Sequence, residues 1–259
     1  MPESAQATPF AQATLALTKR WWWRLKRTPM SIVVAVLQPA LWLLLFGHLF
    51  AESGVVAEYS YIAFMTAGVI VMTVFNGALN GGVEILFDRE TGMLHRLLAA
   101  PIPRGAVLWS RFAFVLGLTT LQALVITLVA YLLGVRIATG LGGLVLVLGI
   151  GILLGIGITA LSMALAFTFK NHAQWFSVIG FVSLPLLFAS NALAPLEVMP
   201  PWLQIIARLN PMTYAIEGAR QLILDGFDWV TTVSMSGVLL LFAAAMMAVA
   251  LSAMRRALD

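Results

Sequence analysis

Six long apolar stretches dominate the chain. They cover approximately residues 30–50, 61–82, 112–133, 141–169, 175–193 and 230–254. Each is close to or above the ~20 residues that an α-helix needs to cross a bilayer core about 30 Å thick. The pattern predicts an all-α integral membrane protein with six transmembrane helices.

Composition agrees with a membrane protein. The chain is 61% hydrophobic and only 10% charged, whereas soluble domains average about 25% charged residues. This leaves too little polar surface for a globule surrounded by water. The formal net charge of +4 comes from basic residues at the ends of the apolar stretches, which favours lipid head groups over nucleic acid as their neighbours.

The basic residues also predict the orientation of the spans. Of the 15 Lys and Arg, only Arg136, Arg208 and Arg220 fall on the side opposite to the termini. The positive-inside rule therefore places both termini and the loop at 83–111 in the cytoplasm. We expect a multi-pass protein of the plasma (inner) membrane.

The N-terminal segment at 1–29 is predicted to be distinct from a six-span domain at 30–259. Phe10, Thr14, Leu17, Trp21 and Leu25 recur on one helical face, and most of the nearby basic residues lie away from that face. We interpret residues 8–27 as an amphipathic interfacial helix that ends at Thr28-Pro29. A charged flank that only orients the first span is the alternative.

A second amphipathic segment lies in the cytoplasmic loop, at about 84–100. Glu84 and Asp88 fall on one side of a helix, and Met93, Leu94, Leu97 and Leu98 then form an apolar strip. Such a strip must pack on a partner protein or on the membrane surface. The segment is therefore either a docking helix or an ordinary interfacial loop helix.

The long outer segment at 194–229 predicts two short helices. Pro200-Pro201 can start the first helix, and Asn210-Pro211 supplies a cap and a first-turn proline for the second. Glu217 and Arg220 are spaced to form an ion pair. Because both helices are apolar, we expect them to re-enter the outer half of the membrane over about 201–225, with a surface hairpin as the alternative.

No enzyme chemistry is evident in the chain. Lys19, Lys26 and Lys170 are the lysines, and none lies in a glycine-rich loop followed by Ser or Thr, so the chain has no P-loop. No catalytic residue, metal site or bound cofactor is expected. The polar residues within the spans either line a transport path or form hydrogen bonds between helices. The candidates for a path are Gln38, Asn76, Asn80, Thr119, Gln122 and Asn191.

Two segments carry a resemblance to a known family. Asp88-Arg89-Glu90-Thr91-Gly92, followed by Leu97-Leu98-Ala99-Ala100-Pro101-Ile102-Pro103-Arg104, resembles the cytoplasmic segment of ABC-2-type transporter permeases. The run from Leu209 to Arg220 resembles the asparagine-proline segment before their last span. The chain looks most similar to the permeases of drug-resistance and nodulation lipo-oligosaccharide exporters.

The resemblance implies a homodimer, or a heterodimer with a similar permease, above a cytoplasmic P-loop ATPase that binds ATP and Mg²⁺. The cargo would be an amphipathic drug, lipid or glycolipid. The implied ATPase-coupling residues are Glu84, Asp88, Arg89, Glu90, Thr91, Gly92, Leu94, Arg96 and Leu97. The implied outer gate comprises Trp202, Asn210, Pro211, Tyr214, Glu217 and Arg220. An ion-coupled secondary transporter and a non-transporting membrane scaffold are the alternative functions.

Overall fold

The structure is a computed structural model that describes residues 8–51, 59–169 and 171–258. The described parts are helical and contain no strand. The elements in chain order are α1 (Phe10–Lys26), α2 (Pro29–Leu49), α3 (Tyr61–Leu79), α4 (Val83–Glu90), α5 (Met93–Ala99), α6 (Arg104–Leu132), α7 (Gly140–Thr168), α8 (His172–Phe188), the 3₁₀ turn η1 (Leu196–Val198), α9 (Pro201–Leu209), α10 (Pro211–Leu224) and α11 (Trp229–Leu258).

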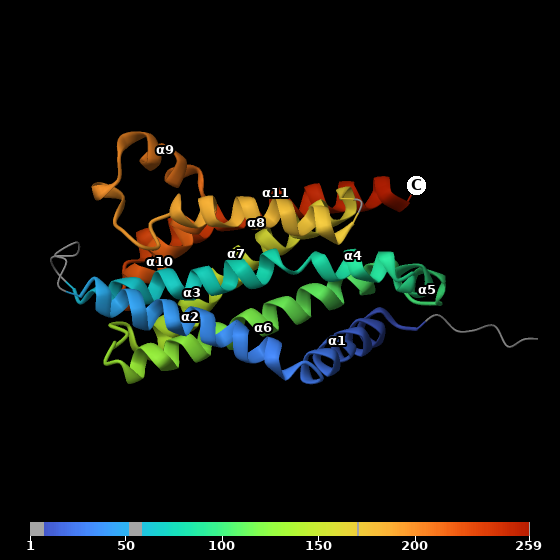
Figure 1. Cartoon of the computed structure of the whole chain (residues 1–259), viewed down its shortest axis with the longest axis horizontal. Helices are drawn as coiled ribbons and strands as arrows, with labels where there is room; N and C mark the ends of the chain where they lie inside the picture. The colour runs from blue at the N-terminus through green and yellow to red at the C-terminus, as the bar shows by residue number, and fades with distance from the viewer. Residues whose placement is uncertain (1–7, 52–58, 170, 259) are drawn as a thin grey trace, which may run out of the picture.

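Helix α3 is the centre of the bundle. It packs against α2, α6, α7 and α10 (Figure 1). Nearly all its side chains are buried. A helix that is apolar on all sides is stable only when neighbours surround it, and α3 meets this condition. The peripheral helices α2 and α11 instead leave many large apolar side chains exposed, as expected for surfaces that face lipid or another chain.

Five helical segments in the described parts are long and apolar enough to cross a membrane. They are Pro29–Leu49, Tyr61–Glu90, Gly105–Leu132, Gly140–Thr168 and Trp229–Arg256. The remaining predicted span corresponds to α8, an apolar helix of 17 residues at the lower end of the ~17–25 that span a bilayer. The all-α membrane fold is thus confirmed.

The end of the fifth predicted span, at 175–193, is corrected by the structure. Helix α8 stops at Phe188, and the next residues turn into the bundle, where Asn191 and Ala192 are buried. A glycine on α3 makes room for this turn, because a Cβ on Gly68 would lie 2.5 Å from the Ala192 carbonyl oxygen. Hydropathy could not separate the helix from the turn because both are apolar.

The two ends of the bundle differ in their elements and charges. Helices α1 and α5 and the C-terminus lie at one end, and α9 and α10 lie at the other (Figure 1). The end with α1 carries the basic residues of α1, Arg96 of α5, and Arg255 and Arg256 of α11. This arrangement agrees with the charge partition read from the sequence, apart from Lys170, which lies outside the described residues.

The predicted N-terminal helix is confirmed as α1, which packs along α6. Trp21 of the predicted apolar face is buried, and Leu17 and Leu25 are half-buried. Pro29 occupies the first turn of α2, so the break after Arg27 lies where the proline predicted it. Residues 1–7 of the predicted N-terminal segment lie outside the described residues.

The last helix, α11, begins with a local cap. The carboxylate of Asp228 accepts hydrogen bonds from the Val230 N–H at 3.0 Å and from the Thr231 hydroxyl. These bonds stabilise the ionised form and hold the pKa of the Asp228 carboxyl below its usual value. The cap fixes where the polar connection from α10 ends and the apolar helix begins.

Candidate functional site

The segment predicted as one docking helix over 84–100 is two helices, so that prediction is wrong in detail. Helix α4 ends at Glu90, and α5 begins at Met93 after Gly92, whose φ of +71° is left-handed. Thr91 helps to end α4 by donating its hydroxyl to the Phe87 carbonyl. Glycine adopts a positive φ without steric cost, and this bend redirects the chain at the base of the bundle.

Two acidic side chains of α4 form ion pairs with α1. Asp88 pairs with Arg20 through Oδ2 and Nη2 at 2.8 Å, and Glu84 pairs with Arg24 at 2.8 Å. The first pair is the more shielded, with side chains 29% (Arg20) and 10% (Asp88) exposed. The two carboxylates one helical turn apart therefore hold the N-terminal helix against α4.

Arg111 of α6 completes this arrangement from the interior. Arg111 is 4% exposed, and its Nε donates to the Gly81 carbonyl at 2.8 Å. The Trp21 ring contacts two cations, with the Arg111 Cζ at 4.5 Å and the Arg20 Cζ at 4.7 Å from its centroid. The sequence pattern placed Arg111 in a loop and did not indicate this role.

The next two residues of α4 reach other helices. Arg89 donates to the Phe169 carbonyl at the end of α7. Glu90 accepts from the His172 N–H at 2.8 Å and contacts the His172 ring at 2.6 Å, at the start of α8. We call the set Arg20, Arg24, Glu84, Asp88, Arg89, Glu90, Arg111 and His172 the charged junction. It links α4 and the turn before it at Gly81 to α1, α6, α7 and α8 at one end of the bundle.

The apolar strip of α5 packs partly on the protein itself. Leu94 is buried in a cluster with Phe112 and Met163, and Leu97 is half-buried. Thr91 and Arg96 are exposed at the base. The segment thus presents a small polar surface at the end of the bundle while its apolar side is anchored within the chain.

At the opposite end, the predicted helix starts are confirmed. Pro201 lies in the first turn of α9, and the Asn210 Oδ1 accepts from the Met212 N–H at 3.0 Å to cap α10, whose first-turn proline is Pro211. The Asn210 Nδ2 also donates to the carbonyls of Leu186 and Ala189, at 2.7 and 2.8 Å. Asn210 therefore joins the start of α10 to the end of α8.

The two outer helices occupy different environments. Helix α10 is largely buried against α3, α7 and α11, whereas α9 projects from the bundle, with Trp202 64% exposed (Figure 1). Tyr214 and Glu217 line a hollow of about 360 Å³ together with Glu197 and Arg208. Trp202 does not line that hollow.

The predicted ion pair between Glu217 and Arg220 is wrong. The Arg220 Nη2 donates to the Asn191 carbonyl at 2.7 Å, and its guanidinium lies 3.7 Å from the Phe64 ring centroid. The pair is absent from the ion pairs of the described residues. The buried turn after α8 supplies a carbonyl partner that helical spacing could not reveal.

Four of the six candidate path residues meet at one place. Gln38 of α2, Asn76 and Asn80 of α3, and Gln122 of α6 line a cavity of about 160 Å³. Thr119 lies beside it, since a Cβ on Gly77 would contact both Thr119 and Gln122. Asn191 does not belong to this group because its carbonyl binds Arg220 in the buried outer turn.

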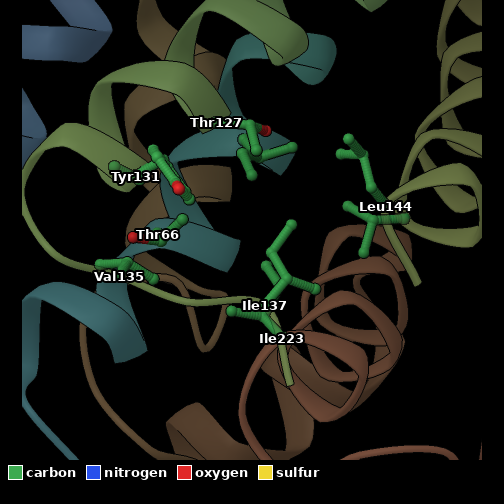
Figure 2. A pocket seen from close by; sticks show the side chains of 10 residues that line it. Thr66, Thr127, Tyr131, Val135, Ile137, Leu144 and Ile223 are labelled. Carbon is green, nitrogen blue, oxygen red and sulfur yellow. The ribbon is translucent and has the colours of Figure 1, made fainter. Parts of the chain in front are cut away.

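A second, mostly apolar cavity lies between α3, α6, α7 and α10. Figure 2 shows Thr66, Thr127, Tyr131, Leu144 and Ile223 around it. Its volume of about 30 Å³ holds roughly one water. The hydroxyls of Thr66 and Thr127 donate to carbonyls of their own helices. We regard this space as a packing gap.

Comparison with known proteins adds a family assignment. The family model described as "ABC-2 type transporter" matches residues 12–224. A putative transport permease, ycf38, of Porphyra purpurea is 42% identical over 218 residues, which is 83% of this chain and 74% of the relative. The daunorubicin resistance ABC transporter permease protein DrrB1 of Streptomyces coeruleorubidus is 27% identical, over 85% of this chain and 79% of its own length. The inner membrane transport permease YadH of Escherichia coli K12 is 24% identical, over 87% and 88%.

Proposed function

This chain belongs to the ABC-2 type transporter family, and from that premise we propose that it is the membrane subunit of an ATP-driven exporter. ATP and Mg²⁺ would bind to a separate cytoplasmic P-loop ATPase. The chain itself is a non-catalytic transport permease. The observation that carries this proposal is the charged junction, which connects the small polar surface at Thr91 and Arg96 to α1, α6, α7 and α8.

The charge distribution supports the orientation of the complex. The end of the bundle with α1 and α5 is rich in Arg and Lys, which favours the cytoplasmic side of the plasma (inner) membrane. Both termini and the docking surface would then face the ATPase. Helices α9 and α10 would close the path at the outer side, with Asn210 holding them to α8.

Coupling follows from the way that α4 and α5 are attached. A partner that pushes on Arg96 or Thr91 moves a segment whose charges are bound to other helices. Because Asp88 contacts α1 and Glu90 contacts α8, these helices would move together with α4. ATP-driven closure of the partner would thereby change the packing of the spans.

The cargo would be an amphipathic drug, lipid or glycolipid. The polar cavity beside α2 supports this class because it offers amide groups next to exposed apolar surface. The name of the Streptomyces relative points to drug resistance for that protein. We further propose a homodimer, or a heterodimer with a similar permease, in which another chain covers part of the exposed apolar surface.

The proposal predicts the partner that accompanies the chain. We expect gentle extraction from the native membrane, followed by mass spectrometry, to recover a soluble P-loop ATPase in about equal amount. The triple variant Asp88→Ala, Arg89→Ala, Glu90→Ala should insert into the membrane and lose this partner or its coupling. A matched triple variant at exposed positions of the opposite end, Glu197→Ala, Arg136→Ala and Asp225→Ala, controls for the loss of two acidic groups and one basic group. A folded chain that repeatedly lacks an ATPase would contradict the proposal.

A further inference from the structure

The cavity between α2, α3 and α6 has several neutral polar groups among apolar lining residues, and none of its described lining residues is charged. Its polar lining comes mainly from the amides of Gln38, Asn76, Asn80 and Gln122, and Trp42 forms part of its wall. The Trp42 ring stacks on Phe46 with centroids 4.8 Å apart, so its position is set by packing. A ligand in this cavity would therefore meet neutral hydrogen-bonding groups and an indole.

Several of these groups lack partners within the chain. Gln122 is 7% exposed, and its Oε1 has no hydrogen-bond partner among the described residues. The side chains of Gln38 and Asn76 also make no hydrogen bond within the described parts. Pro39 has no N–H, so the Ala35 carbonyl at the cavity lacks its usual helical donor. Within the described residues the Gln122 Oε1 is buried and unpaired, whereas Gln38, Asn76 and Asn80 are exposed. Because a buried unpaired amide oxygen is costly, Gln122 favours a ligand that offers a hydrogen-bond donor, and the three exposed amides offer further hydrogen-bonding groups to it.

An apolar groove along the open face of α2, formed by side chains of α2 alone, adjoins the cavity. Val34, Leu37, Leu41 and Leu45 line it, and it shares Gln38 and Trp42 with the polar cavity. The groove has a volume of about 460 Å³. One molecule with a polar head and an apolar chain can occupy both spaces at once.

We propose that this composite site binds an amphiphile that has a neutral, hydroxyl-bearing head group and that enters the site from the membrane. The head group fits the amide cavity, and one hydrocarbon chain lies along α2. An anionic or cationic head would lose its hydration without gaining a counter-charge, which disfavours charged lipids. The inference deepens the proposed function and rests on it, because it names the class of cargo that the exporter would take.

Head-group selectivity tests the site directly on the whole chain. Purified protein is placed in nanodiscs that contain a photoactivatable monohexosyl diacylglycerol, or a phosphatidylglycerol or cationic lipid with the same acyl chains. Crosslinks are mapped by mass spectrometry. We expect the neutral lipid to crosslink to α2 and α3 at least about fivefold more than either charged lipid, since one neutral hydrogen bond is worth roughly that factor.

A pair of matched variants separates the site from general lipid contact. Gln122→Leu and Gln38→Leu should each lower crosslinking of the neutral lipid by about fivefold and leave the charged lipids unchanged. Gln204→Leu makes the same change in α9, outside the cavity, and should have no effect. Equal labelling by all three lipids, no effect of the cavity variants, or no label on α2 because another chain covers it would overturn the proposal.

The outcome of the lipid-crosslinking test does not depend on whether an ATPase is recovered with the chain. Selective labelling without a recoverable ATPase would leave the site in place and refute the exporter function. An ATPase that co-purifies with a chain showing no head-group preference would leave the exporter in place and refute the site.

Discussion

Replacing Asp88 with alanine is expected to release α1 from α4 and to abolish coupled ATP hydrolysis in the complex. The change leaves Arg20 without the carboxylate that lies 2.8 Å away. Removing one partner of a buried pair costs about 3–5 kcal/mol. Because the Arg20 side chain is 29% exposed, we expect about 2–3 kcal/mol here.

The neighbouring pair provides a matched control. Glu84→Ala breaks the contact with Arg24, whose side chain is 52% exposed, and should cost less than about 1 kcal/mol. The exchange variant Arg20→Asp with Asp88→Arg should recover part of the lost stability. Thermal unfolding and ATP hydrolysis of the complex are measured in nanodiscs. Wild-type values for Asp88→Ala in both measurements would show that the charged junction has no mechanical role.

Replacing Gly82 with alanine is expected to prevent native packing of α4 against α7. A Cβ at this position would lie 2.3 Å from the carbonyl oxygen of Ser162 and 2.6 Å from its carbon. The Gly82 N–H also donates to the Ser162 Oγ at 2.7 Å, in a buried bond that the shift would break. Because the atoms in the way belong to the α7 backbone, helices α4 and α7 must move apart. We expect this to lower the free energy of unfolding by about 3–5 kcal/mol.

Glycines with open surroundings in α7 serve as controls. A Cβ on Gly142 or Gly149 would meet no neighbouring helix or side chain within 4 Å, so alanine there should leave stability unchanged or slightly higher. The yield of monodisperse protein and its unfolding temperature are compared for the three variants. Equal behaviour of Gly82→Ala and Gly149→Ala would refute the close approach of α4 and α7.

Local signals predicted much of the fold. Apolar length located the spans, and prolines located the break before α2 at Pro29 and two helix starts, at Pro201 and Pro211. Such features act within a few residues, so they can be read directly from the sequence. The cap at Asn210 was predicted for the same reason, whereas its bonds to the end of α8 were not.

Contacts between distant residues could not be predicted in this way. Arg20 and Asp88 are 68 residues apart, and only the packing of α1 along α6 brings them together. Similarly, Arg220 had an acidic residue at helical spacing but binds the carbonyl of Asn191, 29 residues away. Helical periodicity describes which residues are neighbours on one helix. It contains no information on which distant segment of the chain packs against that helix.

The polar residues in the spans fall between these cases. Residue type singled out Gln38, Asn76, Asn80 and Gln122, and their convergence on one cavity required the structure. Asn191 looked identical in the sequence, yet it lies in a buried turn at the other end. An apolar stretch that contains a polar side chain does not specify which neighbour this side chain meets.

Site-directed photocrosslinking tests the central claim that α5 docks on an ATPase. The chain has no cysteine, so Arg96→Cys in α5 and Ala138→Cys at the opposite end each provide one thiol for a benzophenone maleimide. Both variants are irradiated in native membranes, and the adducts are identified by mass spectrometry. The account predicts an adduct between position 96 and a P-loop ATPase, and none from position 138. Absence of an ATPase adduct at position 96, or equal adducts at both positions, would contradict it.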